Sequence, residues 1–327
     1  MTFAEDMTAD TGAGISGHPP LCCIRCRGEL HDEAEPRCAG CGASYPVDDG
    51  IPRFVPRDNY AEGFGFQWNR HRLTQLDSHT GMPISRERLM TGSGWSGEEL
   101  RGRTVLECGS GAGRFTEVLC ETGALVTSFD ISDAVHANAA SNGSFPNLRL
   151  IQANVYDLPL PEESFDFVLC LGVIQHTPDV ERTFTSLLRH LRPEGRFCVD
   201  VYAAMVAYPH LRQLIRPFTR RMPPARLYSF LERAVPRMLP LSMALSAVPG
   251  VGQGLARLVP VANHRHLGLR DRQTMLSWSV LDTFDWLSPR YEKPQSRRQI
   301  RRWTENLALR EVSIRRRRGM YVIRGVK

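Results

Sequence analysis

The chain has 327 residues, of which 42% are hydrophobic, and a net charge of +6. This size suits one large domain plus a small accessory unit. It contains no run of 18 apolar residues and no basic segment followed by an apolar core at its N-terminus. The sequence therefore predicts neither a transmembrane helix nor a signal peptide, and it favours a cytoplasmic location.

Residues 1–20, rich in Gly, Thr and Asp, are expected to be disordered. Two cysteine pairs follow, Cys23-x-x-Cys26 and Cys38-x-x-Cys41, with 11 residues between them. Pairs at this spacing bring four thiolates to one tetrahedral centre, which predicts a structural Zn²⁺ ribbon over residues 21–56. Two disulfides are the alternative. A closed site of four thiolates has no open coordination position, so the metal would not be catalytic.

A glycine-rich loop follows the first predicted strand of the main domain, in the sequence VLECGSGAG at 105–113. The strand ends at the acidic Glu107, and a helix is predicted to begin near Arg114. Asp130 closes the next apolar run, Ala124–Phe129. Such a loop lets the backbone approach a ligand closely, and an acid about 20 residues later is placed to hold a ribose diol.

The glycine spacing decides between cofactors. The dinucleotide fingerprint needs a small residue where this chain has Arg114, and no G-K-[ST] follows as in a phosphate-binding loop. The E-x-G-x-G-x-G pattern instead resembles motif I of the class I S-adenosylmethionine (SAM)-dependent methyltransferases. SAM carries an ammonium and a sulfonium and no pyrophosphate, which suits an acidic neighbour such as Glu107.

Further strands are predicted at Leu148–Asn154, Phe165–Leu171 and Gly195–Val201, and Val180–Leu191 has helical periodicity. This alternation predicts a doubly wound α/β sheet with ligands at the carboxyl ends of the strands. Gln295–Asn306 is predicted to be the last helix. A terminal hairpin pairs residues 309–315 with 320–325 across Arg316–Gly319. The later segments are also similar to the methyltransferase family, so the resemblance covers residues 60–327 and implies a seven-stranded Rossmann-like sheet with a terminal antiparallel hairpin.

The resemblance implies a set of contacts with SAM. The methionine and ribose part would be contacted by Glu107, Gly109, Ser110, Gly111 and Gly113. Asp130 would bind the ribose hydroxyls, and Ile131 would lie against the adenine. Leu171 and Gly172 would close over the cofactor.

Two further cofactor contacts are less direct. Asn154, with Val155 beside it, stands where the family commonly has Asp, and its carbonyl can still accept a hydrogen bond from the adenine amino group. Phe64-Gly65-x-x-Trp68 resembles an FG-x-x-W segment that helps to cover SAM in related enzymes. A hydrophobic staple that packs an entry helix is the alternative. The cysteine ribbon resembles small zinc ribbons that accompany some methyltransferases. Disulfides are rare in cytosolic enzymes, which argues against the alternative of two disulfides here.

Residues 203–260 form an unusual basic insertion with eight arginines, one acid and eight prolines that divide short apolar stretches. We expect a helical cap on the open end of the sheet, which could serve as a substrate lid. Contact with an anionic membrane is the alternative. Residues 290–327 are also basic, with 13 Lys and Arg against three acids, and the run Arg315–Arg318 is interpreted as a solvated turn.

Candidate acceptor-site residues lie in Trp278–Tyr291, which shows neither strand nor helix periodicity. They are Asp282, Asp285, Arg290 and Tyr291, the last a candidate catalytic residue; loop packing is the alternative. His176, just beyond the fourth predicted strand, is the candidate general base. Its alternative role is to organise that loop.

The predicted function is methyl transfer from SAM to an O or N atom of a small molecule, such as a sugar, a lipid-linked intermediate or a natural product. An RNA methyltransferase is the second hypothesis, because arginine tails and zinc ribbons both occur in RNA enzymes. The near-neutral to acidic ribbon and the lack of an aromatic–basic stacking pattern argue against nucleic acid. A non-catalytic adaptor is the third. The sequence carries no signal for an oligomeric state.

Overall fold

The computed structural model describes residues 17–31, 34–204, 211–269 and 271–327. Most of the N-terminal segment that we expect to be disordered, residues 1–16, lies outside the described residues, as do residues 205–210 of the predicted insertion.

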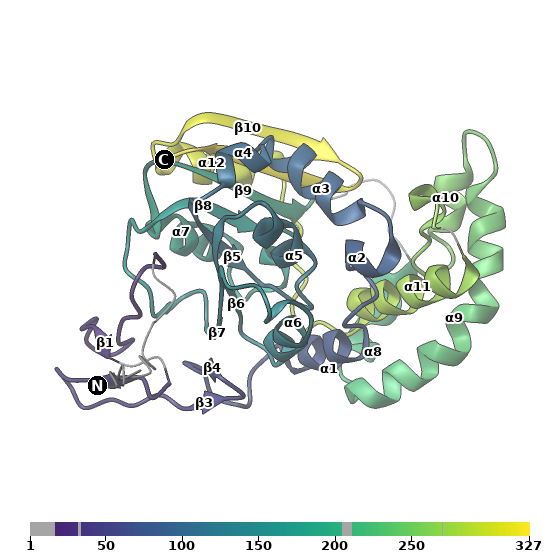
Figure 1. Ribbon diagram of the computed structural model, residues 1–327. Coiled ribbons are helices and arrows are strands. Elements are labelled where there is room, and N and C mark those ends of the chain that lie inside the picture. The colour runs from purple at the N-terminus through teal and green to yellow at the C-terminus, as the bar shows by residue number, and fades with distance from the viewer. Residues whose placement is uncertain (1–16, 32–33, 205–210, 270) are drawn as a thin grey trace, which may run out of the picture.

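A seven-stranded sheet forms the centre of the molecule, in the order β10-β11-β9-β8-β5-β6-β7 (Figure 1). Its strands are β5 (Thr104–Cys108), β6 (Leu125–Asp130), β7 (Leu148–Gln152), β8 (Phe165–Cys170), β9 (Leu191–Tyr202), β10 (Arg310–Arg317) and β11 (Met320–Val326). Strands β5 to β9 are parallel, whereas β11 runs antiparallel to both β9 and β10. The predicted doubly wound sheet with a terminal antiparallel hairpin is therefore confirmed.

Both faces of the parallel strands β5, β6, β7 and β8 are buried, which explains their largely apolar sequences. Neighbouring residues of a strand point to opposite faces, so Leu106 joins the core under α7 (Val180–Arg189) and α12 (Arg297–Asn306). Val105 joins the core under α5 (Arg114–Glu121). The remaining helices beside the sheet are α1 (Glu62–Arg70), α2 (Asp77–Thr80), α3 (Ile84–Ser93), α4 (Gly97–Leu100), α6 (Ala134–Asn142) and the 3₁₀ turn Ile174–His176.

The cysteine-rich segment lies at the β7 edge of the sheet. It contains two short hairpins, β1 (Leu30–His31) with β2 (Arg37–Cys38), and β3 (Val47–Asp48) with β4 (Ile51–Pro52). Arg53 forms a parallel bridge with Gln152 of β7, and the Arg27 guanidinium donates to the carbonyls of Leu158 and Leu160. The segment therefore covers a strand edge that would otherwise be open.

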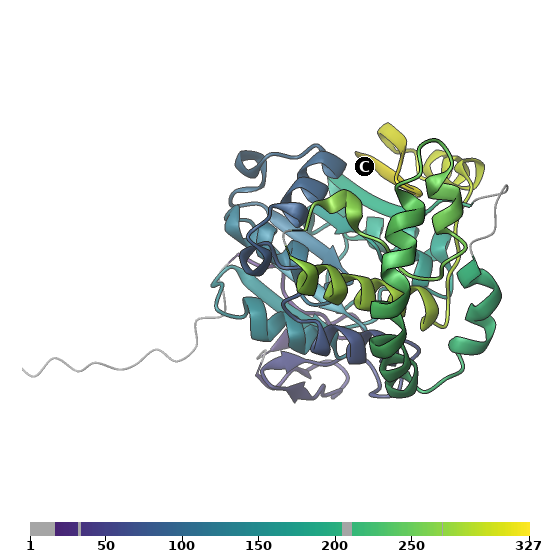
Figure 2. The ribbon, with the colours of Figure 1, turned by 90° about the vertical axis from the view of Figure 1, so that its right-hand side faces the viewer.

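The helical cap has its own apolar core, in which Leu231 and Val235 of one helix meet Phe284 of another. The cap comprises α8 (Leu211–Thr219), α9 (Pro224–Ser246), α10 (Gly252–Ala256), the 3₁₀ turn Arg265–Leu267 and α11 (Arg272–Leu287). In Figures 1 and 2 these helices lie together on one side of the sheet, next to α1 and α2.

Two sequence predictions about the cap are wrong. Residues 278–287, expected to lack periodicity, belong to α11, which is buried on several sides and therefore shows no clean polar stripe. Pro236 and Pro240, expected to separate short stretches, lie inside the single helix α9. The carbonyls that these prolines leave without a helical donor belong to the exposed Glu232 and half-buried Pro236, where water can satisfy them.

None of the helices in the described part of the chain is long and apolar enough to cross a membrane.

Candidate functional site

The glycine-rich loop turns sharply between β5 and α5 because its glycines adopt backbone conformations that other residues rarely take. Gly111 has φ +51°, and a Cβ there would lie 3.1 Å from the Trp68 indole. Gly113 has φ +89°, and a Cβ there would lie 2.1 Å from Asn138 Oδ1 on α6. The first glycine thus admits the indole against the loop, and the second lets α5 pack on α6.

Asp130 fixes this loop from the end of β6. Its Oδ2 accepts a hydrogen bond of 3.0 Å from the Gly111 amide, and its Oδ1 accepts bonds from the amide and hydroxyl of Ser132 at 2.9 and 2.7 Å. Burial raises the pKa of the Asp130 carboxyl. The carboxylate still has free lone pairs on the side of a large cavity, where it is placed to accept from a diol.

This cavity has a volume of about 1190 Å³ and lies between the carboxyl ends of the strands and the cap. We call it the chamber. Most of the predicted cofactor residues line it: Trp68, Gly109, Ser110, Gly111, Asp130, Ile131, Val155, Leu171 and Gly172. Ser110 Oγ is buried and has no hydrogen-bond partner among the described residues, so a polar atom of the wall is left for a ligand. The arrangement fits a nucleoside cofactor.

Three predicted cofactor residues are not part of the chamber wall. Glu107 is buried behind the loop, where Thr116 and Ser128 donate hydroxyl hydrogen bonds to its carboxylate. Gly113 faces α6. The Asn154 side chain accepts from the Tyr156 amide within its own turn, at 3.1 Å. Their predicted contacts with SAM would therefore have to be indirect or to follow a local rearrangement.

Comparison with known proteins identifies this region. Residues 106–199 match a family model described as a methyltransferase domain. A protein of Mycolicibacterium smegmatis, named a probable S-adenosylmethionine-dependent methyltransferase, is 31% identical over 41% of this chain and 51% of its own length. The ubiquinone biosynthesis O-methyltransferase of Pseudomonas fluorescens is 33% identical over 30% of this chain and 43% of its own. Over residues 106–199 the chain therefore resembles the methyltransferase domain family.

These matches are partial, because the chain spans about half the length of the curated relatives. Human N-acetylserotonin methyltransferase, solved in complex with SAM, is 14% identical, with a TM-score of 0.45 over 83% of this chain and 63% of that chain.

The half of the chamber that faces the cap contains the predicted His176. Its Nδ1 lies 3.1 Å from the backbone carbonyl of Tyr291, which can only accept, so Nδ1 carries the hydrogen. The other nitrogen, Nε2, is buried without a hydrogen-bond partner in the described structure and lies 4.0 Å from the carboxylate of Asp285. In the neutral imidazole, Nε2 is therefore a free acceptor at the chamber wall.

Only two of the four predicted acceptor-site residues line the chamber. Asp282 and Asp285 line the chamber from α11. Burial raises the pKa of Asp285. For Asp282, burial is outweighed by the nearby His264, 3.0 Å away, together with the charges of Arg114 and Arg88, so the pKa of Asp282 is lowered. The side chains of Arg290 and Tyr291 are not part of the wall: Arg290 is exposed, and the Tyr291 ring packs on Tyr60 with centroids 5.4 Å apart. Tyr291 contributes its carbonyl to His176 rather than a catalytic side chain.

Several residues of the chamber wall are not predicted by the sequence patterns. Asp200, at the end of β9, accepts from Arg88 at 2.9 Å and from the Gly172 amide at 2.5 Å. Trp278 presents a buried indole nitrogen that has no partner in the described ranges. An acid at the carboxyl end of a parallel strand is the same signal that singled out Asp130, so Asp200 could have been found. Arg88 and Trp278 lie in no motif.

The four cysteines of the ribbon form a cluster whose sulfur atoms all lie within 4.8 Å of one another. Cys23 Sγ is 3.5 Å from Cys41 Sγ, and Cys26 Sγ is 3.4 Å from Cys38 Sγ. Zn–S bonds of about 2.3 Å place tetrahedral sulfurs about 3.8 Å apart, so the cluster fits a zinc ion with little adjustment. All four thiols are free in this structure, and the Tyr45 hydroxyl lies 3.1 Å from Cys23 Sγ, where it can stabilise a thiolate.

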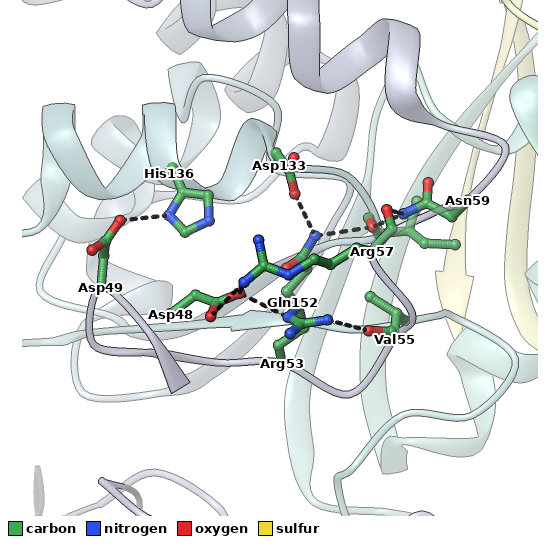
Figure 3. Close-up of polar contacts among 10 residues, drawn as sticks. Asp48, Asp49, Arg53, Val55, Arg57, Asn59, Asp133, His136 and Gln152 are labelled. Carbon is green, nitrogen blue, oxygen red and sulfur yellow. Dashed lines mark hydrogen bonds and ion pairs between the residues drawn. The ribbon is translucent and has the colours of Figure 1, made fainter. Parts of the chain in front are cut away.

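The ribbon is joined to the cofactor wall by a polar network (Figure 3). The Phe54 amide donates to the Gln152 carbonyl at 2.8 Å, and the Gln152 side chain donates to the Ile131 carbonyl at 3.3 Å. Asn59 donates to the same carbonyl at 3.0 Å. The segment that leaves the ribbon thereby holds the loop that presents Ile131 to the chamber.

Proposed function

We propose that this protein transfers the methyl group of SAM to an oxygen or nitrogen atom of a small molecule held in the cap-facing half of the chamber. The single observation that carries the proposal is His176, whose Nε2 has no hydrogen-bond partner among the described residues and lies at the same chamber as the Asp130-anchored loop. SAM, when bound, supplies an activated methyl carbon on its sulfonium. A ligand pocket measures about 300–1,000 Å³, so the chamber of about 1190 Å³ has room for a cofactor and a second small molecule.

The protein's main contribution is orientation of the two reactants, which can lower a barrier by about 7–11 kcal/mol. Bound SAM, held by the loop at Asp130, would supply the methyl group to the acceptor's lone pair and would keep the electrons of the broken S–CH₃ bond on sulfur. His176 Nε2 takes the proton of the acceptor's O–H or N–H group. The Tyr291 carbonyl keeps Nδ1 protonated and so leaves Nε2 as the acceptor.

The position of the cap over the chamber supports a small acceptor over RNA. Ser242, Arg257 and His264 of the cap line the chamber opposite the sheet, and a polynucleotide would need an open groove there. The Trp278 indole nitrogen, Asp282 and His264 provide hydrogen-bonding groups for a polar acceptor. Among the relatives, printed names include both O- and C-methyltransferases, so the acceptor atom is part of the proposal.

The test compares His176→Asn with His190→Asn. Both histidines place Nδ1 near a backbone carbonyl, Tyr291 for His176 and Pro161 for His190, but His190 lies outside the chamber wall. With labelled SAM and a panel of hydroxyl and amine acceptors, His176→Asn should lower turnover about 10²–10⁴-fold and leave SAM affinity unchanged. His190→Asn should keep turnover near the wild-type level. Loss of SAM affinity in His176→Asn, or label transferred to RNA alone, would contradict the proposal.

A further inference from the structure

The cap exposes an unusual amount of apolar surface. In the described structure nine large hydrophobic side chains are exposed, and all of them except Leu73 lie between Leu214 and Leu258. The most exposed are Phe218 at 74%, Leu214 at 65% and Leu258 at 64%. Exposed hydrophobic residues are ordinary when scattered, but a concentration in one region of the fold marks an interaction surface.

Helix α9 organises part of this surface into a stripe. Its exposed residues Arg226, Phe230, Arg233, Arg237 and Leu241 are spaced by four, three, four and four residues, which places them along one side of the helix. The opposite side carries the buried Leu231, Val235 and Leu239 that form the cap core. We call the five exposed residues the α9 stripe. Figure 2 shows the helix α9 at the front of the cap.

The arginines of the α9 stripe are not neutralised within the described protein. Arg233 and Arg237 donate only to backbone carbonyls one turn earlier, and no ion pair of the described residues involves Arg226, Arg233 or Arg237. By contrast, Arg212 and Arg216 on α8 are paired with the half-buried Glu292 at 3.3 and 2.8 Å. The stripe thus combines apolar side chains with cationic groups that lack a partner of opposite charge.

Apolar side chains beside unpaired arginines indicate which class of partner the cap can bind. A second copy of the chain, packed about a twofold axis, would bring the same arginines face to face, and like charges repel. Single-stranded nucleic acid would need aromatic platforms among the cations, and the stripe offers one phenylalanine. An anionic bilayer satisfies both features, because apolar side chains enter the headgroup boundary while arginines contact lipid phosphates.

We propose that the cap docks on an anionic lipid bilayer through the α9 stripe, flanked by the exposed apolar residues of α8 and of the segment 248–258. The interaction is peripheral and lies outside the chamber. It is independent of cofactor binding, so SAM affinity measured in solution reports on the fold and the chamber without reporting on the docking.

Co-sedimentation of the full chain with phosphatidylglycerol–phosphatidylcholine vesicles tests the proposal, with pure phosphatidylcholine vesicles as the neutral comparison. The wild type should bind the anionic vesicles at low salt and lose most of this binding at high salt. Each arginine near an anionic surface contributes about 1 kcal/mol, so the triple variant R226Q/R233Q/R237Q should bind about 100-fold more weakly. The double variant F230S/L241S should bind at least about tenfold more weakly.

A matched control removes the same charge elsewhere. Arg297, Arg298 and Arg301 are exposed on α12, away from the cap's apolar surface. The variant R297Q/R298Q/R301Q should change vesicle binding less than about threefold, and all three variants should keep wild-type SAM affinity. The proposal is overturned if the wild type ignores anionic vesicles at low salt, or if the α12 control loses as much binding as the α9 variant. It is equally overturned if F230S/L241S converts a stable dimer to a monomer, or if the wild type binds RNA in place of vesicles.

Discussion

Replacing Glu107 with glutamine should remove a pH dependence that this buried carboxyl imposes on the fold. Glu107 is 2% exposed, and its carboxylate accepts hydroxyl hydrogen bonds from Thr116 and Ser128. Burial raises its pKa from 4.5 to about 7, although these hydrogen bonds favour the ionised form. Desolvation therefore outweighs hydrogen bonding at this position.

The sign of the effect follows from proton binding. Between pH 4.5 and about 7 the folded protein holds a proton on Glu107 that the unfolded chain has released, so the free energy of unfolding falls as the pH rises through this window. The shift corresponds to about 3 kcal/mol. Glutamine does not titrate. The stability of Glu107→Gln relative to the wild type should therefore rise by about 3 kcal/mol between pH 4.5 and pH 8.

Urea unfolding followed by tryptophan fluorescence at several pH values measures this difference. Asp166→Asn is a control, because hydrogen bonds from Thr104 and the charge of Arg192 overcome burial and lower the pKa of Asp166 below 3.8. Asp166 therefore titrates below pH 4.5 in both the folded and the unfolded protein. The stability of Asp166→Asn relative to the wild type should stay constant from pH 4.5 to 8. A constant difference for Glu107→Gln as well would show that Glu107 is ionised at no cost and refute the reasoning.

Three other perturbations test the site. Cys41→Ser should lower the zinc content measured by atomic emission and weaken SAM binding by roughly three- to tenfold, because the ribbon holds the Ile131 loop; unchanged affinity in a zinc-free protein would contradict this coupling. Gly113→Ala should destabilise the protein by about 2 kcal/mol or more in urea, whereas Gly254→Ala, in open space on α10, should be neutral or slightly stabilising. Trp68→Ala should weaken SAM binding roughly tenfold in calorimetry, while a loss of stability alone would favour the hydrophobic-staple interpretation.

The sheet could be predicted from the sequence because its signals are local. Apolar runs that are buried on both faces form the parallel strands, and the predicted loop holds Gly109, Gly111 and Gly113, all with positive φ. The chamber wall near Asp130 follows from the same pattern, since parallel strands bring their carboxyl ends to one edge.

The rest of the site depends on packing between distant segments. Helix α11 packs on both the cap core and the chamber, so it lacks the polar face by which a helix is recognised. The orientation of His176 depends on the backbone carbonyl of Tyr291, 115 residues later. Every residue has such a carbonyl, so a sequence pattern cannot predict this contact. Glu107 was assigned to the ligand on its motif, whereas the strand register turns its carboxylate toward Thr116 and Ser128.

The central claim is that the chamber binds SAM through the Asp130-anchored loop, and titration calorimetry of the full chain tests it most directly. The wild type should bind one SAM per chain, and Asp130→Ala should weaken binding at least about tenfold, because it removes the acceptor for the ribose and the anchor of the Gly111 amide. No binding by the wild type, or equal affinity in Asp130→Ala, would contradict the account.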